Sequence, residues 1–139
     1  MKINVMLDHG AKMPTKAHET DAGFDIYCTE PFDVPARGFF KVDTGVHMEI
    51  PKGYVGFLKS KSGLNVLKGI RGEGVIDSGY TGSIVVKLYN DTDLPVCFRS
   101  GEKITQIVIL PIPEVELNLV DRFAETERGD GGFGSTGRF

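Results

Sequence analysis

The sequence lacks a long apolar run, because no stretch approaches the ~18 apolar residues that a membrane-spanning helix requires. Its first ten residues, Met1 to Gly10, contain too short an apolar run for a signal peptide and include the charged Asp8. We therefore expect a cytoplasmic protein with no membrane partner.

Cysteine and excess charge are also scarce. Cys28 and Cys97 are the only cysteines and show no Cys-x-x-Cys spacing, so neither a disulfide framework nor a zinc site is predicted. Both lie in apolar, strand-like segments, and we expect buried free thiols. The formal net charge of -3 excludes the global basic field that drives non-specific binding to nucleic acid. We expect no nucleic-acid partner, and any anionic ligand must be held by local groups.

Helical periodicity is absent from every 12-residue stretch, although 114–125 is ambiguous. Eighteen Gly and seven Pro separate short segments rich in Val, Ile, Phe and Tyr, which indicates an all-β sandwich, barrel or jelly roll. With 139 residues the chain is long enough for one domain with a real core, and we expect a single domain over 1–139. The predicted strands are Lys2–Leu7, Phe39–Ile50, Tyr54–Ser60, Ser83–Asn90 and Lys103–Ile112.

Two segments depart from the ordinary alternation of a half-buried strand. Lys103–Ile112 is apolar on both faces, and a subunit interface is one explanation. Arg128–Gly137 contains five Gly in ten residues and cannot form a packed element by itself. We expect a flexible Gly-rich C-terminal arm over 124–139.

Five short clusters carry residue types suited to chemistry on a phosphorylated ligand. The first, Ala22–Ile26, places Asp25 in an apolar strand start, where a turn or cap role is the ordinary explanation. The second, Lys59–Gly63, offers a hydroxyl, backbone N–H groups and positive charge to a phosphate, although charged turns of this kind are common. The fourth, Gly101–Gln106, is a turn that leads into a strand.

The third cluster, Gly74–Gly82, has the pattern of a β-hairpin. Its open backbone edges could pair with a planar base and Tyr80 could pack on a sugar, whereas in an ordinary hairpin Asp77 is only a turn residue.

The fifth cluster, Arg128–Gly137, combines convergent backbone N–H groups, an Arg for phosphate and the single Phe133 for stacking on a base. This is the composition of a nucleotide lid, although a disordered tail is the alternative. No Lys-Ser/Thr follows the glycines, so the cluster is not a Walker A loop.

Taken in this order and at these intervals, the five clusters resemble the five motifs of the trimeric dUTPases. The resemblance implies an all-β jelly-roll β-barrel, and a homotrimer whose active sites are shared among the subunits. It also implies hydrolysis of dUTP to dUMP and pyrophosphate, which keeps uracil out of DNA and supplies dUMP for dTMP synthesis. Mg²⁺ on the triphosphate would be the cofactor.

The resemblance implies roles for individual residues. Asp77 would deprotonate the water that attacks the α-phosphorus, Asp25 would help to hold the magnesium water shell, and Tyr80 would exclude a 2′-hydroxyl. Backbone groups around Val75 and Ile76 would recognise uracil. The remaining substrate-binding residues would be Lys61, Ser62, Gly63 and Gln106 on the phosphate chain, Phe133 over the uracil, Arg128 near the γ-phosphate, and Gly134, Ser135, Thr136 and Gly137 in the closing arm.

Three positions depart from the family pattern. Lys61 stands where Arg is usual, and Lys cannot make the planar two-pronged contact of Arg, so we expect weaker phosphate binding there. Gly79 replaces an acidic residue, and Arg71 stands where some bacterial members have Asn.

Other functions remain open on the sequence. A dCTP deaminase, or a bifunctional deaminase and dUTPase, would need a carboxylate near the base, and Glu73 is the only candidate nearby. A nucleotide-gated trimer that binds a regulatory protein, and a purely structural jelly roll, are the non-enzymatic alternatives.

Overall fold

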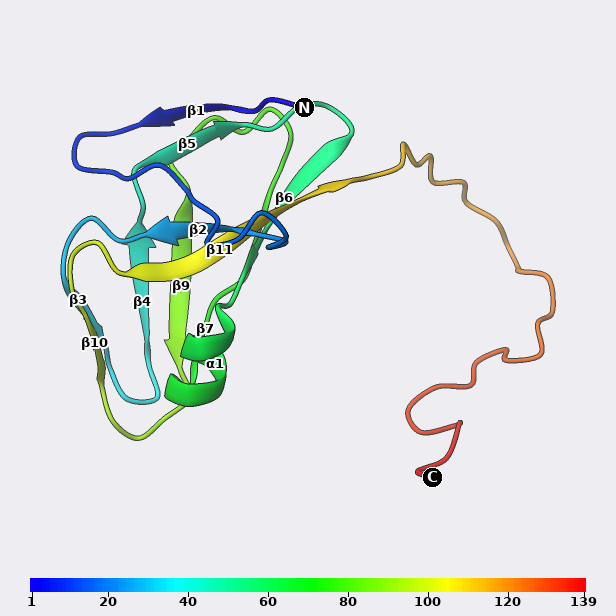
Figure 1. Ribbon diagram of the computed structural model, residues 1–139. Helices are drawn as coiled ribbons and strands as arrows, with labels where there is room; N and C mark the ends of the chain where they lie inside the picture. The colour runs from blue at the N-terminus through cyan, green and yellow to red at the C-terminus, as the bar shows by residue number, and fades with distance from the viewer.

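The computed structural model describes all residues, 1–139, and shows a β-rich body from which the C-terminal segment extends (Figure 1). The elements in chain order are β1 (Asn4–Leu7), β2 (Phe24–Tyr27), β3 (Phe32–Val34), β4 (Phe39–Asp43), β5 (Val46–Glu49), β6 (Tyr54–Lys59), α1 (Ser62–Lys68), β7 (Ile70–Arg71), β8 (Gly74–Ile76), β9 (Val85–Asn90), β10 (Val96–Phe98) and β11 (Lys103–Pro111).

Two antiparallel sheets form most of the body. One has the strand order β2-β11-β6-β8 and the other has the order β4-β9-β7, while β1 pairs with β5 and β3 pairs with β10. Buried side chains from both sheets join one cluster of 16 residues, which includes Ile26, Leu58 and Ile107 from the first sheet and Val86 and Leu88 from the second. The predicted all-β jelly-roll class is confirmed.

Strand β9 shows how the sequence pattern produces a sheet with two unequal faces. Val86, Leu88 and Asn90 are buried, whereas Val85 points outward and is half exposed. The buried Asn90 donates through Nδ2 to the carbonyls of Val34 and Leu94, so its polar side chain is satisfied inside the body. The alternation predicted for 83–90 is therefore confirmed.

The predicted strand Phe39–Ile50 is interrupted, which corrects one expectation. The chain turns between β4 and β5 at Gly45, whose φ of 64° lies in the left-handed region that favours glycine. The Asp43 carboxylate accepts the Gly45 N–H at 3.0 Å and stabilises the turn. The apolar pattern runs through the turn, so hydrophobicity alone did not reveal it.

The expected hairpin at Gly74–Gly82 is wrong. Strand β8 pairs with β6 in one sheet, whereas β9 pairs with β4 and β7 in the other. The segment between them, residues 77–84, therefore connects two sheets and does not close a ladder; its first seven residues are called the Asp77–Ser83 loop.

Helix α1 was not predicted either. It has only seven residues and buries none of them, with Val66 and Leu67 78% and 82% exposed, so it has no apolar stripe to detect. It ends at Lys68 and is capped by Gly69, whose φ of 63° lies in the left-handed region. The prediction for Cys97 is also wrong, because Cys28 is buried but Cys97 is exposed.

Beyond β11 the chain contains no further helix or strand. The ambiguous segment 114–125 is not helical, and its apolar side chains are exposed, with Leu117 at 92% and Leu119 at 98%. Figure 1 shows this segment leaving the end of β11 and running outside the body. The structure contains no helix with the length and apolar character needed to cross a membrane.

Because one leucine is in the core and another is on the surface, we predict that their replacement by alanine has very different effects on stability. Leu58 is 1% exposed in β6 and Leu67 is 82% exposed in α1. We expect Leu58→Ala to lower the free energy of unfolding by about 2–5 kcal/mol through a cavity, and Leu67→Ala by less than about 0.5 kcal/mol. Urea unfolding followed by circular dichroism measures both, and similar losses would contradict the assigned core.

Candidate functional site

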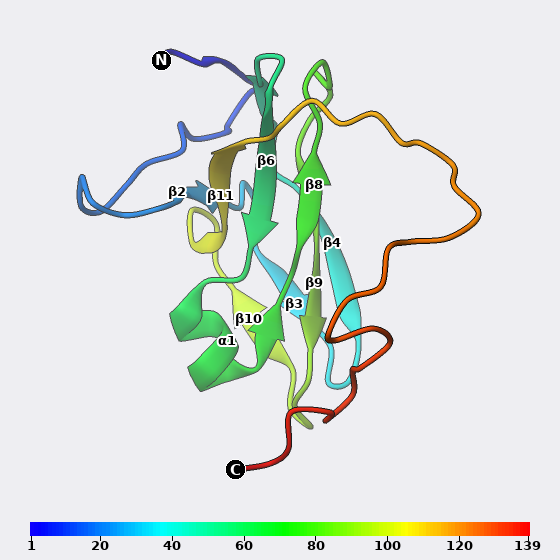
Figure 2. The ribbon, with the colours of Figure 1, turned by 90° about the vertical axis from the view of Figure 1, so that its right-hand side faces the viewer.

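Three of the five predicted motifs meet on neighbouring strands. Gln106 in β11 lies opposite Asp25 of β2 on one side and opposite Lys59 of β6 on the other. Strand β6 then leads through Ser60 and Lys61 into α1. The antiparallel register therefore brings the first, second and fourth motifs to one end of the sheet, as Figure 2 shows for β6, β11 and α1.

Asp25 is the buried charge of this cluster. The residue is 6% exposed, and its carboxylate accepts from Lys61 Nζ and forms a 2.7 Å ion pair with Lys103 Nζ. Burial alone would raise the pKa of Asp25, but the hydrogen bonds and charges of Lys103 and Lys61 outweigh burial and lower it. Two ammonium groups face one carboxylate, so these three side chains carry a net positive charge.

Lys61, Ser62 and Gly63 lie where strand β6 turns into α1. Lys61 keeps an extended backbone, with φ of -76° and ψ of 132°, and Ser62 begins the helix. Ser62 and Gly63 are exposed, and open space surrounds the position that a Cβ of Gly63 would occupy. These two residues are accessible to a ligand beside the Lys61 ammonium.

Gln106 is fixed from two sides. Its Nε2 donates to the Ser60 carbonyl at 3.1 Å, and its Oε1 lies against Gly23, where an added Cβ would come within 2.6 Å. Gly23 therefore makes room for the Gln106 side chain. Gly23 and Lys103 both lie inside predicted motifs, but no local sequence pattern indicates their roles, because these come from pairing across strands.

The third motif lies at the opposite end of the sheet. Ile76 pairs with Gly56 of β6, so the next residue, Asp77, is level with Val55. Asp25 is level with Lys59 through Gln106, and Lys59 is four residues further along β6. At about 3.3 Å per residue and three strand spacings of about 4.8 Å, the two carboxylate residues are roughly 20 Å apart. Figure 2 likewise shows the loop after β8 and helix α1 at opposite ends. Within one chain, Asp77 cannot act on a phosphate held at Lys61.

The Asp77–Ser83 loop is anchored although its key residues are exposed. Asp77 and Tyr80 face solvent, with Tyr80 45% exposed, and Val75 before them is 58% exposed. His47 Nδ1 donates to the Thr81 carbonyl at 2.8 Å, since a carbonyl can only accept, and His47 Nε2 lies 3.1 Å from Asp8. The bond to Thr81 and then that to Asp8 raise the pKa of His47.

The residues of the fifth motif lie apart from all the others. Arg128 donates through Nε to the Gly131 carbonyl at 2.7 Å, and Phe133 is fully exposed. Local turns join Ser135 N–H to the Gly132 carbonyl and Gly137 N–H to the Gly134 carbonyl. The structure therefore brings together Asp25, Lys61, Ser62, Gly63 and Gln106, and leaves the third-motif residues and the arm separate.

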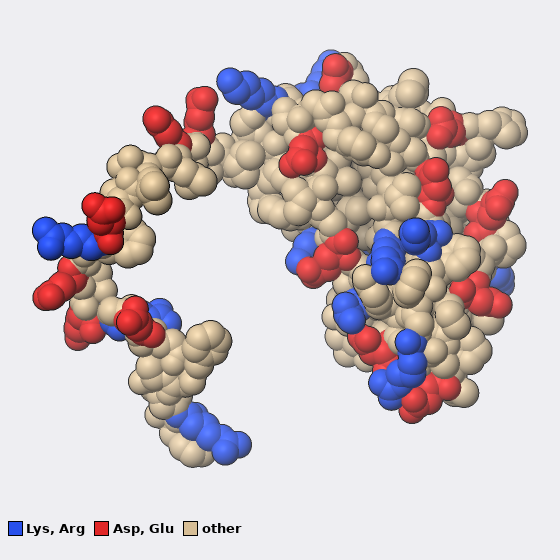
Figure 3. Space-filling model, turned by 180° about the vertical axis from the view of Figure 1, so that it is seen from behind, with Lys and Arg blue, Asp and Glu red and all other residues tan.

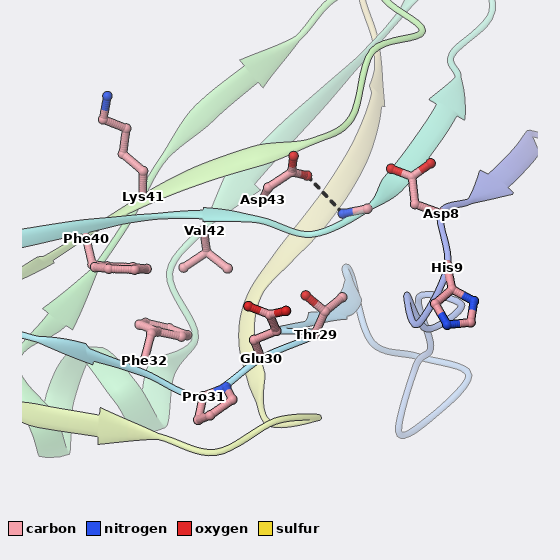
Figure 4. Close-up of a pocket in the computed structure, with 11 residues that line it drawn as sticks. Asp8, His9, Thr29, Glu30, Pro31, Phe32, Phe40, Lys41, Val42 and Asp43 are labelled. Atoms are coloured by element: carbon pink, nitrogen blue, oxygen red, sulfur yellow. Dashed lines mark hydrogen bonds between the residues drawn. The ribbon is translucent and has the colours of Figure 1, made fainter.

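A separate cavity is lined by none of the predicted site residues. It has a volume of about 420 Å³ and is lined by Asp8, Glu30, Lys41 and Asp43 together with apolar groups. Figure 4 shows the Phe32 and Phe40 rings facing each other at its side, with centroids 5.0 Å apart.

Other charged residues near the motifs are paired with one another. Glu73, the one carboxylate available for a deaminase, is exposed and bonded to Lys59 Nζ at 2.8 Å. Arg71, at one departure from the family pattern, pairs with Asp91 at 2.8 Å and lies over the Tyr89 ring. Acidic and basic side chains intermingle over the face seen in Figure 3, which shows no continuous basic patch.

Comparison with known proteins identifies the relatives of this chain. The dUTPase family model matches residues 9–137. A deoxyuridine 5′-triphosphate nucleotidohydrolase of Kluyveromyces lactis is 41% identical, with 92% of this chain and 88% of the relative covered. One from Gloeobacter violaceus is 38% identical, with 94% and 92% covered.

Solved structures of phage proteins are similar throughout the fold. The dUTPase of Staphylococcus bacteriophage 80alpha with dUPNHPP gives a TM-score of 0.93 at 32% identity, with 99% of each chain covered. A mutant dUTPase from phage phi11 of S. aureus, described with a structural Mg(II) ion, gives a TM-score of 0.82 at 30% identity, with 88% and 99% covered.

From the ion pairs of Asp25 with Lys61 and Lys103, we predict that the effect of removing one lysine on protein stability depends on pH. The pKa of Asp25 is lower in the folded state than in the unfolded chain. The stabilisation by its ion pairs is therefore fully present above the unfolded-state pKa of about 4, and it is lost as the pH falls through the folded-state pKa. At pH 6 we expect Lys103→Met to lower the free energy of unfolding only modestly, because the Lys103 side chain is 40% exposed and solvent screens its charge. Denaturant titrations at pH 6 and pH 3 should show the difference shrinking at the lower pH.

Lys41→Met is the control, because Lys41 is an exposed lysine that lines the separate cavity. A Lys103→Met cost that is unchanged at pH 3, or that is matched by Lys41→Met, would mean that the Asp25 pair is not its origin.

Proposed function

The chain belongs to the dUTPase family, and from this premise we propose that it hydrolyses dUTP to dUMP and pyrophosphate. The observation that carries the proposal is the family match over residues 9–137, which spans the complete set of five motifs. The relatives at 38–41% identity bear the name of this reaction.

Asp77 is the proposed general base. It would take a proton from a water molecule as the water oxygen bonds to the α-phosphorus and the bond from that phosphorus to the bridging oxygen breaks, so that pyrophosphate leaves. The exposed position of Asp77, in a loop anchored by His47, supports this role because substrate must reach the carboxylate from solvent.

The phosphate chain would lie at Lys61, Ser62, Gly63 and Gln106. This end of the sheet is positively charged, because the two positive charges of Lys61 and Lys103 outnumber the one negative charge of Asp25. Gln106 has one amide hydrogen committed to Ser60 and a second one available for a phosphate oxygen. Lys61 would contact phosphate as a point charge, without the two-pronged geometry of Arg.

The active site would be shared among subunits of a homotrimer. The separation of roughly 20 Å between Asp25 and Asp77, from strand spacings, supports this assembly because general-base catalysis requires contact at about 3 Å or through one water. One subunit would supply Asp77, a second the phosphate-binding residues, and the third the arm.

Substrate selection would involve the third motif. Backbone groups at Val75 and Ile76 would pair with uracil, and the ring of Tyr80 would lie under the deoxyribose. A site whose polar groups remain unpaired with the wrong base can discriminate by roughly 10⁴-fold. The exposure of Val75 and Tyr80 supports a role in ligand contact.

The C-terminal arm would close over the bound nucleotide. Phe133 would cover uracil, Arg128 would lie near the γ-phosphate, and Gly134, Ser135, Thr136 and Gly137 would complete the lid. The full exposure of Phe133 supports this role, because a large apolar ring without a partner in its own chain can be buried on a ligand.

Mg²⁺ is the proposed cofactor, bound chiefly by the substrate. No group of three or more His, Cys, Asp or Glu residues could hold a metal ion by itself, which fits an ion that uses phosphate oxygens, waters and few carboxylates. Asp25 is the residue that would face its water shell. The ion would supply positive charge where pyrophosphate develops negative charge.

Replacement of the proposed base tests the reaction. Wild-type protein with Mg²⁺ should release pyrophosphate from dUTP in preference to dCTP, dTTP and UTP. Asp77→Asn should lower kcat by at least about 100-fold, the range of general-base catalysis, with dUTP affinity and thermal unfolding nearly unchanged. Near-normal turnover by this variant would exclude Asp77 as the base, and ammonia release from dCTP at the rate of pyrophosphate formation would indicate a bifunctional deaminase.

Deletion of the arm tests the lid separately. Removal of residues 128–139 should leave the oligomeric state unchanged, because these residues contribute nothing to the buried core. It should abolish most dUTP turnover. Sedimentation beside a pyrophosphate assay checks both expectations, and dissociation into monomers would show instead that the arm holds subunits together.

A further inference from the structure

The ring of Tyr80 is fixed at both ends. Its hydroxyl donates to the Ser83 carbonyl at 2.9 Å, which closes the Asp77–Ser83 loop on itself. The ring also lies directly against Gly82, because an added Cβ there would come within 2.5 Å of the hydroxyl oxygen and 2.7 Å of Cζ. The hydroxyl end of the ring therefore lies against the Gly82 backbone, and the side chain is still 45% exposed.

Ser83, which receives the Tyr80 hydroxyl, is tied to the end of strand β4. Its own Oγ donates to Asp43 Oδ1, and the same carboxylate oxygen accepts the Gly45 N–H at 3.0 Å. The bond from Ser83 is the largest cause of a lowered pKa of Asp43, followed by the bond from Gly45. Next to this contact, Thr44 N–H and Oγ both donate to the Ile84 carbonyl, at 3.1 and 2.8 Å. The turn between β4 and β5 thus fixes Ser83, whose carbonyl accepts the hydrogen bond of the Tyr80 hydroxyl.

We propose that Gly82, Ser83 and Asp43 are positioning residues that set the preference for deoxyribose over ribose by keeping the Tyr80 ring in place. The inference rests on the proposed function and assigns a further task to a turn remote in sequence. A steric filter against one hydroxyl works only if the ring cannot recede, and a side chain held only at Cα can rotate about χ1. Functional groups must stay within about 0.5 Å of the working position, and attachment of the hydroxyl end provides this.

If the contacts of Gly82, Ser83 and Asp43 have only a general structural role, their loss should affect the two substrates differently from what the proposal predicts. If they only stabilise the loop, their loss disturbs Asp77 as well, and hydrolysis of dUTP and UTP falls by the same factor. If they position the ring, UTP gains relative to dUTP. The ratio of kcat/KM for dUTP to kcat/KM for UTP distinguishes the two roles.

The experiment compares this ratio in wild type, Gly82→Ala, Asp43→Ala and Tyr80→Phe, each with a crystal structure to locate the ring. Gly82→Ala is expected to displace the ring and to lower the ratio at least tenfold. Asp43→Ala and Tyr80→Phe should each lower it about 3- to 10-fold, the factor of one hydrogen bond. Asp93→Ala is the matched control, because Asp93 is an exposed aspartate paired with Arg37 away from the loop, and its ratio should stay at the wild-type value.

An unchanged ratio in Gly82→Ala, with both substrates slowed equally, would overturn the inference while leaving dUTP hydrolysis in place. A wild-type protein without dUTP turnover would instead refute the proposed function. In that case the crystal structures still decide the positioning, because a Tyr80 ring that remains in place in both Gly82→Ala and Asp43→Ala would overturn it. Thermal unfolding separates a variant that fails to fold from one with a displaced ring.

Discussion

The antiparallel register of β11 between β2 and β6 is the constraint on which the candidate site depends. Gln106 is opposite Asp25 on one side and Lys59 on the other, so a single strand aligns three motifs that are far apart in the sequence. A shift of one residue would turn Ile107 out of the core and Gln106 into it. The same hydrophobic alternation that stabilises the fold therefore places the polar groups of the site.

The sequence revealed the residue types of the site but not their spatial grouping. The β-class and the alternation of β9 followed from period-2 patterning, because burial on one face requires it. The division of Phe39–Ile50 at Gly45 was hidden by continuous apolar character, and α1 was hidden because nothing in it is buried. The role of Lys103 toward Asp25 arises only when strands pair, so no local pattern could contain it.

The segment Gly74–Gly82 likewise depends on contacts that are remote in the sequence. An apolar pair, a glycine-containing turn and an alternating strand satisfy every local criterion of a hairpin. The flanking strands nevertheless join different sheets, and the loop is held by His47 and Asp43 rather than by a ladder. Long-range hydrogen bonds attach the loop to the rest of the body, and these are the least accessible to inference from sequence.

The distance between Asp25 and Asp77 has a consequence for how the protein would behave on dilution. If catalysis requires groups from different copies, an isolated subunit is inert, and the active species obeys mass action. Specific activity would then fall steeply once the subunit concentration drops below the dissociation constant of the assembly. Ligand that bridges the copies would oppose this loss, so substrate would act as a cross-link as well as a reactant.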